Sequence, residues 1–121
     1  MDTQVSEPSI GARTGACAGT LNRDGSIEVS GDLDLYSAPG LLELIEQAVR
    51  EHSRRGLGHV RIRCPGLDFC DSSGLGALIR AQQYAQDAGV TLGLVECPPH
   101  LVYLLSLSGV EYLFPADGDE R

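Results

Sequence analysis

The segment Asp71-Ser72-Ser73-Gly74-Leu75-Gly76 places two hydroxyl groups beside a carboxylate at the expected start of a helix. The N-terminus of a helix has unpaired backbone N–H groups and carries the positive end of the helix dipole, so a phosphate there finds hydrogen-bond donors. A serine at this place can therefore act as a covalent switch. Short motifs often match by chance, however, and the hexapeptide alone favours a structural role in which Asp71 or Ser72 caps the helix.

Two more carboxylates, Asp32 and Asp34, follow a predicted strand, just as Asp71 and Ser72 follow the next strand along the chain. Functional crevices in α/β sheets lie beyond the carboxyl ends of the parallel strands, so we expect the two groups to meet there. A pair of carboxylates can perform acid–base chemistry, but no further Asp or Glu gives these two the setting of a glycosidase site. Helix capping or solvation explains them better.

The sequence offers few residues for catalysis. Ser72 could act as a hydrolase nucleophile with His100 as its base, but the Gly-x-Ser-x-Gly turn is absent and His100 lies beside Pro99 at another helix start. The glycines at 74 and 76 do not form a dinucleotide-binding fingerprint, and there is no phosphate-binding P-loop. No His or Cys pair has the spacing of a metal site. We therefore expect a binding module without enzymatic activity, cofactor or metal.

The composition limits the partners of such a module. The chain has 121 residues, 42% of them hydrophobic, which suits one domain with its own core. Its net charge of −8 argues against nucleic acid and anionic membranes as partners. The four cysteines are expected to be reduced and mostly buried, as in a cytoplasmic protein, and neither a signal peptide nor a membrane-spanning run is evident. They are Cys17, Cys64, Cys70 and Cys97.

The elements that must position these residues alternate between strands and helices. Period-two alternation predicts strands, and apolar residues at helical spacing predict helices. The expected strands span residues 17–21, 26–30, 59–64, 90–95 and 112–114, with an Asp-Gly hairpin turn at 22–25. The expected helices run from an N-cap at Ser37 to about Ser53, from Ser72 to Asp87, and from Pro98 to Leu107, and Pro65-Gly66 is expected to end the third strand. This order predicts an α/β domain whose mixed, mostly parallel sheet packs against about three helices. The domain should span residues 16–115, between a flexible tail (1–15) and an acidic tail (116–121).

The third predicted helix is apolar almost all round. A period of 3.6 residues places Leu101 and Leu105 on one face and Tyr103 on the opposite face. We expect Tyr103 and Leu107 to be partly exposed. They then either form a small apolar patch for association or lie under a neighbouring segment such as 112–114.

Three ordered segments resemble the signatures of the bacterial anti-sigma factor antagonists, which are single STAS domains. The first runs from Gly31 to Asp34 and continues through Tyr36-Ser37-Ala38. The second and most specific runs from Leu67 to Leu75, and the third from Pro98 to Val110. The resemblance covers about Cys17 to Phe114, and three motifs in the right order are far more specific than one alone.

The resemblance implies a function based on partner switching in the cytoplasm. Such proteins bind an anti-sigma factor that is also a serine kinase, and thereby release a sigma factor. Phosphorylation of the serine that follows the Asp, here Ser72, ends the complex, and a phosphatase restores it. Asp34 matches an acidic position near this serine. The residues expected to contact the partner are Asp32, Asp34, Asp71, Ser73 and Gly74.

The sequence departs from the family pattern in three places. Asp32 stands where Glu is usual, Cys70 replaces a larger apolar residue, and the third helix lacks its usual basic residue. These departures leave the identity of the partner open. The alternative function is a non-enzymatic STAS scaffold or a nucleotide-sensing module of a larger assembly.

Overall fold

The computed structural model describes residues 18–114 and forms a single layer of sheet covered by helices. The strands are β2 (Ala18–Leu21), β3 (Ile27–Leu33), β4 (His59–Cys70) and β5 (Thr91–Val95). The helices are α1 (Ala38–Arg54), α2 (Ser72–Asp87) and α3 (Pro99–Leu107), followed by the 3₁₀ turn η2 (Glu111–Leu113). The predicted α/β fold with a mixed, mostly parallel sheet and three helices is confirmed.

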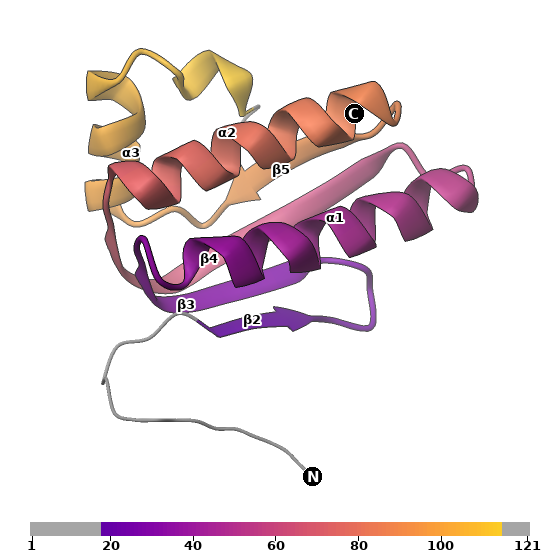
Figure 1. Ribbon diagram of the computed structural model, residues 1–121, viewed down its shortest axis with the longest axis horizontal. Coiled ribbons are helices and arrows are strands. Elements are labelled where there is room, and N and C mark those ends of the chain that lie inside the picture. Colours follow the sequence, from indigo (N-terminus) through magenta and orange to yellow (C-terminus); the bar gives the residue numbers. More distant parts are fainter. Residues whose placement is uncertain (1–17, 115–121) are drawn as a thin grey trace, which may run out of the picture.

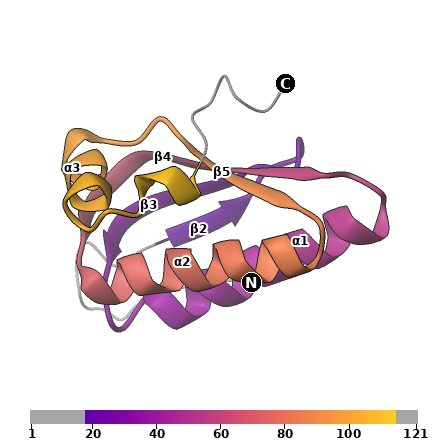
Figure 2. The same ribbon diagram turned by 90° about the horizontal axis from the view of Figure 1, so that it is seen from above.

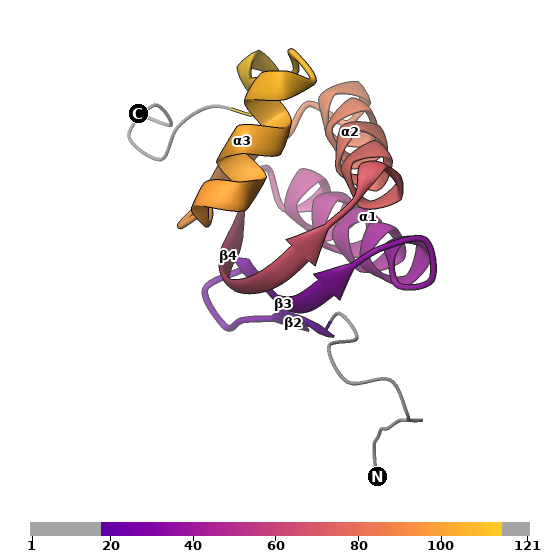
Figure 3. The same cartoon turned by 90° about the vertical axis from the view of Figure 1, so that its left-hand side faces the viewer.

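The sheet has the strand order β2-β3-β4-β5, with β2 antiparallel to β3 and the other neighbours parallel. Two successive parallel crossovers, through α1 and then α2, move across the sheet in the same direction. Because such crossovers are right-handed, both helices fall on the same face of the sheet. Figures 1 and 3 show α1 and α2 side by side over that face, with α3 apart from α1 near β4. The N-termini of α1 and α2 therefore lie at one edge of the sheet, where β3 and β4 end (Figure 1).

The core lies between the sheet and the pair of helices. The inward residues of β3 and β4 alternate with more exposed ones, whereas β5 is buried from Leu92 to Val95. The apolar faces of α1 and α2 close over these strands. Its largest fully buried side chains include Ile27, Leu33, Ile45, Ile62 and Leu78. Leu42 of α1 and Ile79 of α2 pack against this core and are half-buried.

The predicted end of the third strand at Pro65-Gly66 is wrong, because β4 continues to Cys70. The pairing with β3 shifts between Glu28 and Ser30, whose partners are Arg63 and Gly66. One extra residue of β4 is thus accommodated beside Pro65, and such a bulge tolerates a residue that has no N–H to donate. β3 is also longer than predicted, since it pairs with this extension up to Leu33.

The predicted strand at 112–114 is also wrong, because Glu111–Leu113 forms η2 and Phe114 is the residue that follows this short helix. The buried side-chain amide of Gln82 donates to the carbonyl of Leu92 (2.8 Å) and to that of Leu113. The same side chain accepts from the N–H of Leu92 at 3.4 Å. The side chain of Gln82 therefore occupies the N–H and C=O of Leu92, which a further strand beside β5 would otherwise pair with. Figure 2 shows η2 between α3 and β5.

The third helix shows the exposure that its sequence predicts. Leu101 and Leu105 are buried, whereas Tyr103 and Leu107 are 66% and 69% exposed.

None of the helices in residues 18–114 combines the length and the apolar character needed to cross a bilayer. The tails predicted at 1–15 and 116–121 lie outside the described residues.

Three of the cysteines lie within the described residues, and no disulfide joins them. Cys64 is buried, and Cys70 and Cys97 are half-buried. A hydrogen bond from the Cys64 thiol lowers the pKa of Cys97. Cys17 lies outside the described residues. Within 18–114, no group of three or more His, Cys, Asp or Glu side chains is placed to hold a metal ion.

Candidate functional site

The start of α2 exposes one serine and caps itself with the preceding carboxylate. Asp71 has extended backbone angles, and its side chain accepts a hydrogen bond from the N–H of Gly74 at 3.0 Å. The cap is therefore Asp71, as one of the two structural alternatives predicted. Ser72 is the first residue of the helix and is exposed, while Ser73 is half-buried. The hydroxyl of Ser72 is left available for chemistry at the positive end of the helix dipole.

Gly74 lets this helix start approach the end of β3. A Cβ atom built on Gly74 would lie 2.6 Å from both the side-chain Cγ and the carbonyl oxygen of Leu33, and 3.1 Å from the sulfur of Cys70. The N–H of Asp71 donates to the same Leu33 carbonyl at 3.2 Å. Gly74 is buried, and the absence of a side chain there allows this close packing.

Asp34 organises the loop between β3 and α1. Its Oδ1 accepts from the N–H of Tyr36 (3.0 Å) and of Ser37 (3.1 Å), and from the Ser37 hydroxyl (3.3 Å). The Ser37 hydroxyl in turn donates to the carbonyl of Asp32 at 2.9 Å. Ser37 occupies the N-cap position of α1 but makes no side-chain cap, so the predicted capping role is wrong. The short polar side chains hold the loop together locally, as Asp and Ser do in turns.

Asp32 lies inside β3, not in the loop where the sequence placed it. It is half-buried and pairs with Phe69 of β4. The expectation that the two acidic segments meet is confirmed at the level of the backbone, because Leu33 pairs with Cys70 and bonds to Asp71. Asp32, Asp34 and Asp71 thus place three carboxylates near the carboxyl ends of β3 and β4, where Ser72 also lies.

A groove of about 330 Å³ opens between the first turns of α1 and α2. Ser72 and Ser73 border it, together with Gly76 and Arg80 further along α2. The opposite wall is apolar and comes from the start of α1; it consists of Leu35, Ala38, Pro39 and Leu42. The site therefore combines an exposed hydroxyl, an apolar wall and one arginine, with carboxylates at the serine end.

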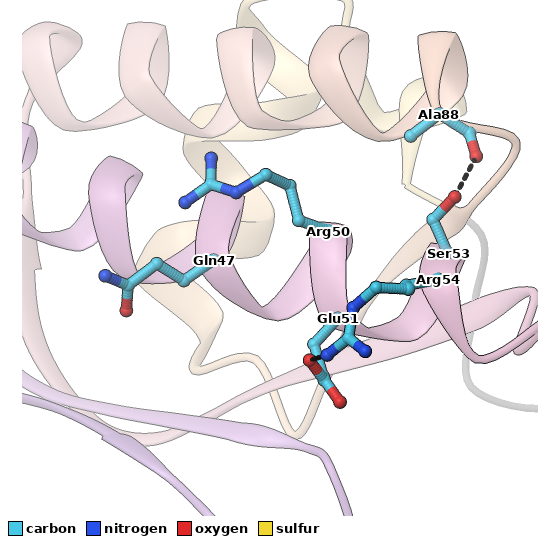
Figure 4. A pocket seen from close by; sticks show the side chains of 6 residues that line it. All are labelled: Gln47, Arg50, Glu51, Ser53, Arg54 and Ala88. Carbon is cyan, nitrogen blue, oxygen red and sulfur yellow. Dashed lines mark hydrogen bonds and ion pairs between the residues drawn. The ribbon is translucent and has the colours of Figure 1, made fainter.

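A larger hollow, of about 540 Å³, lies near the other end of the same two helices (Figure 4). Its rim is made by Gln47 and Arg50, and the hydroxyl of Ser53 donates to the carbonyl of Ala88 at 3.0 Å across it. Arg54 pairs with Glu51 within the rim. This hollow is an open dip between exposed polar side chains and holds none of the predicted site residues. Size alone does not identify the functional site here.

The structure does not support the hydrolase alternative, in which His100 acts as a base for Ser72. The Nε2 atom of His100 lies 2.8 Å from the carbonyl oxygen of Leu67, which joins α3 to β4. His100 thus has a structural hydrogen bond of its own, and the structure offers no bond that would orient it as a base toward Ser72.

Three residues of α2 that line the groove, Gly76, Ala77 and Arg80, were not predicted as site residues. Gly76 belongs to the motif at residues 71–76, and Arg80 lies beyond it in the same helix. The spacing of the sequence could have identified Gly76 and Arg80. Positions 72, 76 and 80 follow one another at intervals of four, so Gly76 and Arg80 share a face of the helix with Ser72. Leu35 and Pro39 were also missed, since only the fold brings the start of α1 beside α2.

The chain is similar to known STAS domains over nearly all of the described residues. The family model described as "Mlab, STAS domain" matches residues 19–115. An "Anti-sigma F factor antagonist" of Paenibacillus polymyxa is 26% identical over 94 residues, which cover 78% of each protein. The anti-sigma factor antagonist SpoIIAA in its unphosphorylated form has the same fold, with a TM-score of 0.64 and 17% identity over 87% of this chain and 90% of that one. The phosphorylated form of the Bacillus protein gives a TM-score of 0.54 and 18% identity over 87% and 94% of the two chains.

Proposed function

The chain belongs to the STAS domain family, and from this premise we propose that it is an anti-sigma factor antagonist switched off by phosphorylation of Ser72. It binds an anti-sigma factor that is also a serine kinase, in the cytoplasm, and so releases a sigma factor. A phosphatase that acts on phosphorylated Ser72 restores binding. The observation that carries the proposal is the exposed Ser72 hydroxyl at the start of α2, beside the Asp71 cap and at the border of the groove. Relatives that share the family or the fold are described as anti-sigma factor antagonists, and one is known in a phosphorylated form.

Electrostatics explains how a phosphate on Ser72 would end the complex without unfolding the protein. Phosphorylation adds about −1.5 to −2 charges. The positive end of the α2 dipole tolerates this charge within the fold. The Asp71 carboxylate already accepts the Gly74 N–H, so the phosphate lies beside an existing negative charge. A partner surface that matches neutral Ser72 would then face concentrated negative charge and lose its fit.

The test is phosphorylation by purified candidates. Each anti-sigma factor kinase encoded in the same genome is incubated with this protein and ATP. The product is then analysed by intact mass and peptide mapping. One added phosphate on the peptide that contains Ser72 supports the proposal. Absence of phosphorylation by every candidate, together with absence of binding, would contradict it.

Replacing Ser72 by Asp should weaken partner binding at least tenfold while the fold is retained. The carboxylate introduces a negative charge at the same position, and the helix N-terminus accommodates it. Titration calorimetry against the kinase measures the affinity, and circular dichroism measures the melting temperature. Ser106→Asp, at an exposed position of α3, is the matched control and should leave the affinity unchanged. Equal affinities of Ser72→Asp and the unmodified protein would speak against the charge mechanism.

Asp34→Asn should slow phosphorylation of Ser72 or weaken the complex, while the melting temperature stays nearly constant. The Asn side chain keeps an oxygen that can accept the hydrogen bonds from Tyr36 and Ser37, so only the charge is removed. Asp34→Ala instead removes this acceptor and should destabilise the protein by about 1–2 kcal/mol. Phosphorylation kinetics and calorimetry of both variants separate the two effects. If Asp34→Asn behaves as the unmodified protein in both, Asp34 has only a structural role.

A further inference from the structure

Gly76 has no structural reason to be a glycine. It lies in the second turn of α2, within regular helix. A Cβ atom built on it would meet nothing within 4 Å, whereas at Gly74 the same atom would collide with Leu33. Glycine inside a helix is unfavourable compared with alanine, because its backbone loses more freedom on folding. Alanine at this position would therefore make helix α2 more stable than glycine does.

The groove explains why position 76 is a glycine, which the packing of the fold does not. Gly76 lines the groove midway between Ser72 and Arg80, which are four residues away in each direction. Side chains at this spacing lie along one face of a helix, so a side chain at position 76 would occupy the groove between them. The missing side chain leaves the apolar wall formed by Leu35, Pro39 and Leu42 accessible.

The two ends of the groove also differ in charge. The carboxylates of Asp34 and Asp71 belong to the serine end, and exposed Arg80 is the one basic residue among the described residues that line the groove. Opposite charges at the two ends fix the orientation of a bound segment more than they add affinity.

We propose that Gly76 keeps the groove open for an apolar side chain of the anti-sigma factor, and that Arg80 binds a carboxylate next to that side chain. Gly76 and Arg80 are then specificity-determining residues of the interface. The proposal rests on the proposed function, since the occupant is the kinase that phosphorylates Ser72. It predicts that helix stability and partner affinity change in opposite directions when a side chain is added at position 76.

The test compares additions at Gly76 with matched additions at Gly40. Gly40 is an exposed helical glycine of α1 that also has nothing within 4 Å of an added Cβ, and it does not line the groove. Gly76→Ala and Gly40→Ala should each raise the melting temperature by about 2–6 °C, as expected from helix propensity. Gly76→Ala should weaken binding of the purified kinase about tenfold, and Gly76→Gln should weaken it further. Gly40→Ala and Gly40→Gln should leave the affinity unchanged.

A second variant tests the charged end. Arg80→Gln should reduce the affinity several-fold and make it less sensitive to salt, because a screened ion pair is lost. Equal affinities of Gly76→Ala, Gly76→Gln and the unmodified protein would overturn the proposal while leaving the proposed function intact. A drop in melting temperature for Gly76→Ala would also overturn it, since the glycine would then have a structural role. If the unmodified protein neither binds nor is phosphorylated by any candidate kinase, the proposed function fails and this inference fails with it.

Discussion

Ser72→Ala is expected to abolish phosphorylation and to leave the protein bound to its anti-sigma factor in the presence of ATP. The variant lacks the hydroxyl that accepts the phosphate, so the switch cannot be turned off. Its free energy of unfolding should change by less than about 0.5 kcal/mol, because Ser72 is exposed and the helix cap is Asp71. Intact mass, calorimetry and thermal denaturation measure the three quantities.

The control for this substitution is the neighbouring serine. Ser73→Ala keeps the Ser72 hydroxyl and should still accept one phosphate, although its affinity can change because Ser73 also lines the groove. Phosphate found on Ser73 of the unmodified protein would reassign the switch. A loss of about 1 kcal/mol in Ser72→Ala with unchanged phosphorylation elsewhere would make Ser72 a structural residue only.

Gly74→Ala is expected to have the largest effect on stability. The added Cβ would lie 2.6 Å from the carbonyl oxygen and from Cγ of Leu33, so the start of α2 must move away from β3. Such overpacking costs about 1–3 kcal/mol, or more when the obstructing atom is backbone. For a domain of this size the melting temperature should fall by roughly 10 °C or more. Thermal and urea denaturation provide the measurement.

Gly76→Ala is the matched control, because it adds the same methyl group two residues later on the same helix. Its melting temperature should rise, not fall, since nothing lies within 4 Å of the added atom. The opposite signs distinguish a glycine required by packing from one that leaves a groove open. A Gly74→Ala variant that melts at the temperature of the unmodified protein would show that the close approach to Leu33 is not needed.

Local sequence signals predict the helices well and the strands less well. The bounds of α2 agree with the prediction, because an Asp cap and a clear apolar face define that helix locally. The extension of β4 past Pro65-Gly66 was missed, since the bulge that accommodates the proline depends on the partner strand β3. Likewise, η2 replaces a predicted strand because Gln82, some 30 residues away in sequence, occupies the edge of β5.

The same distinction applies to the site. The motif alone identifies Ser72 and Asp71, and their exposure and capping follow from the helix start. The role of Asp34 in its own loop depends on Ser37 turning back toward β3, which no periodicity reveals. The two glycines of the motif look alike in sequence. Only the packing shows that Gly74 touches Leu33 while Gly76 faces open space.

The proposed switch is tested most directly by the affinity of the purified anti-sigma factor kinase for this protein before and after stoichiometric phosphorylation, with the phosphate mapped on the same sample. We expect a single phosphate on Ser72, a loss of affinity of at least tenfold, and a circular dichroism spectrum that is unchanged. Undiminished binding of protein phosphorylated on Ser72, or loss of binding with the phosphate on another residue, would contradict the proposed switch.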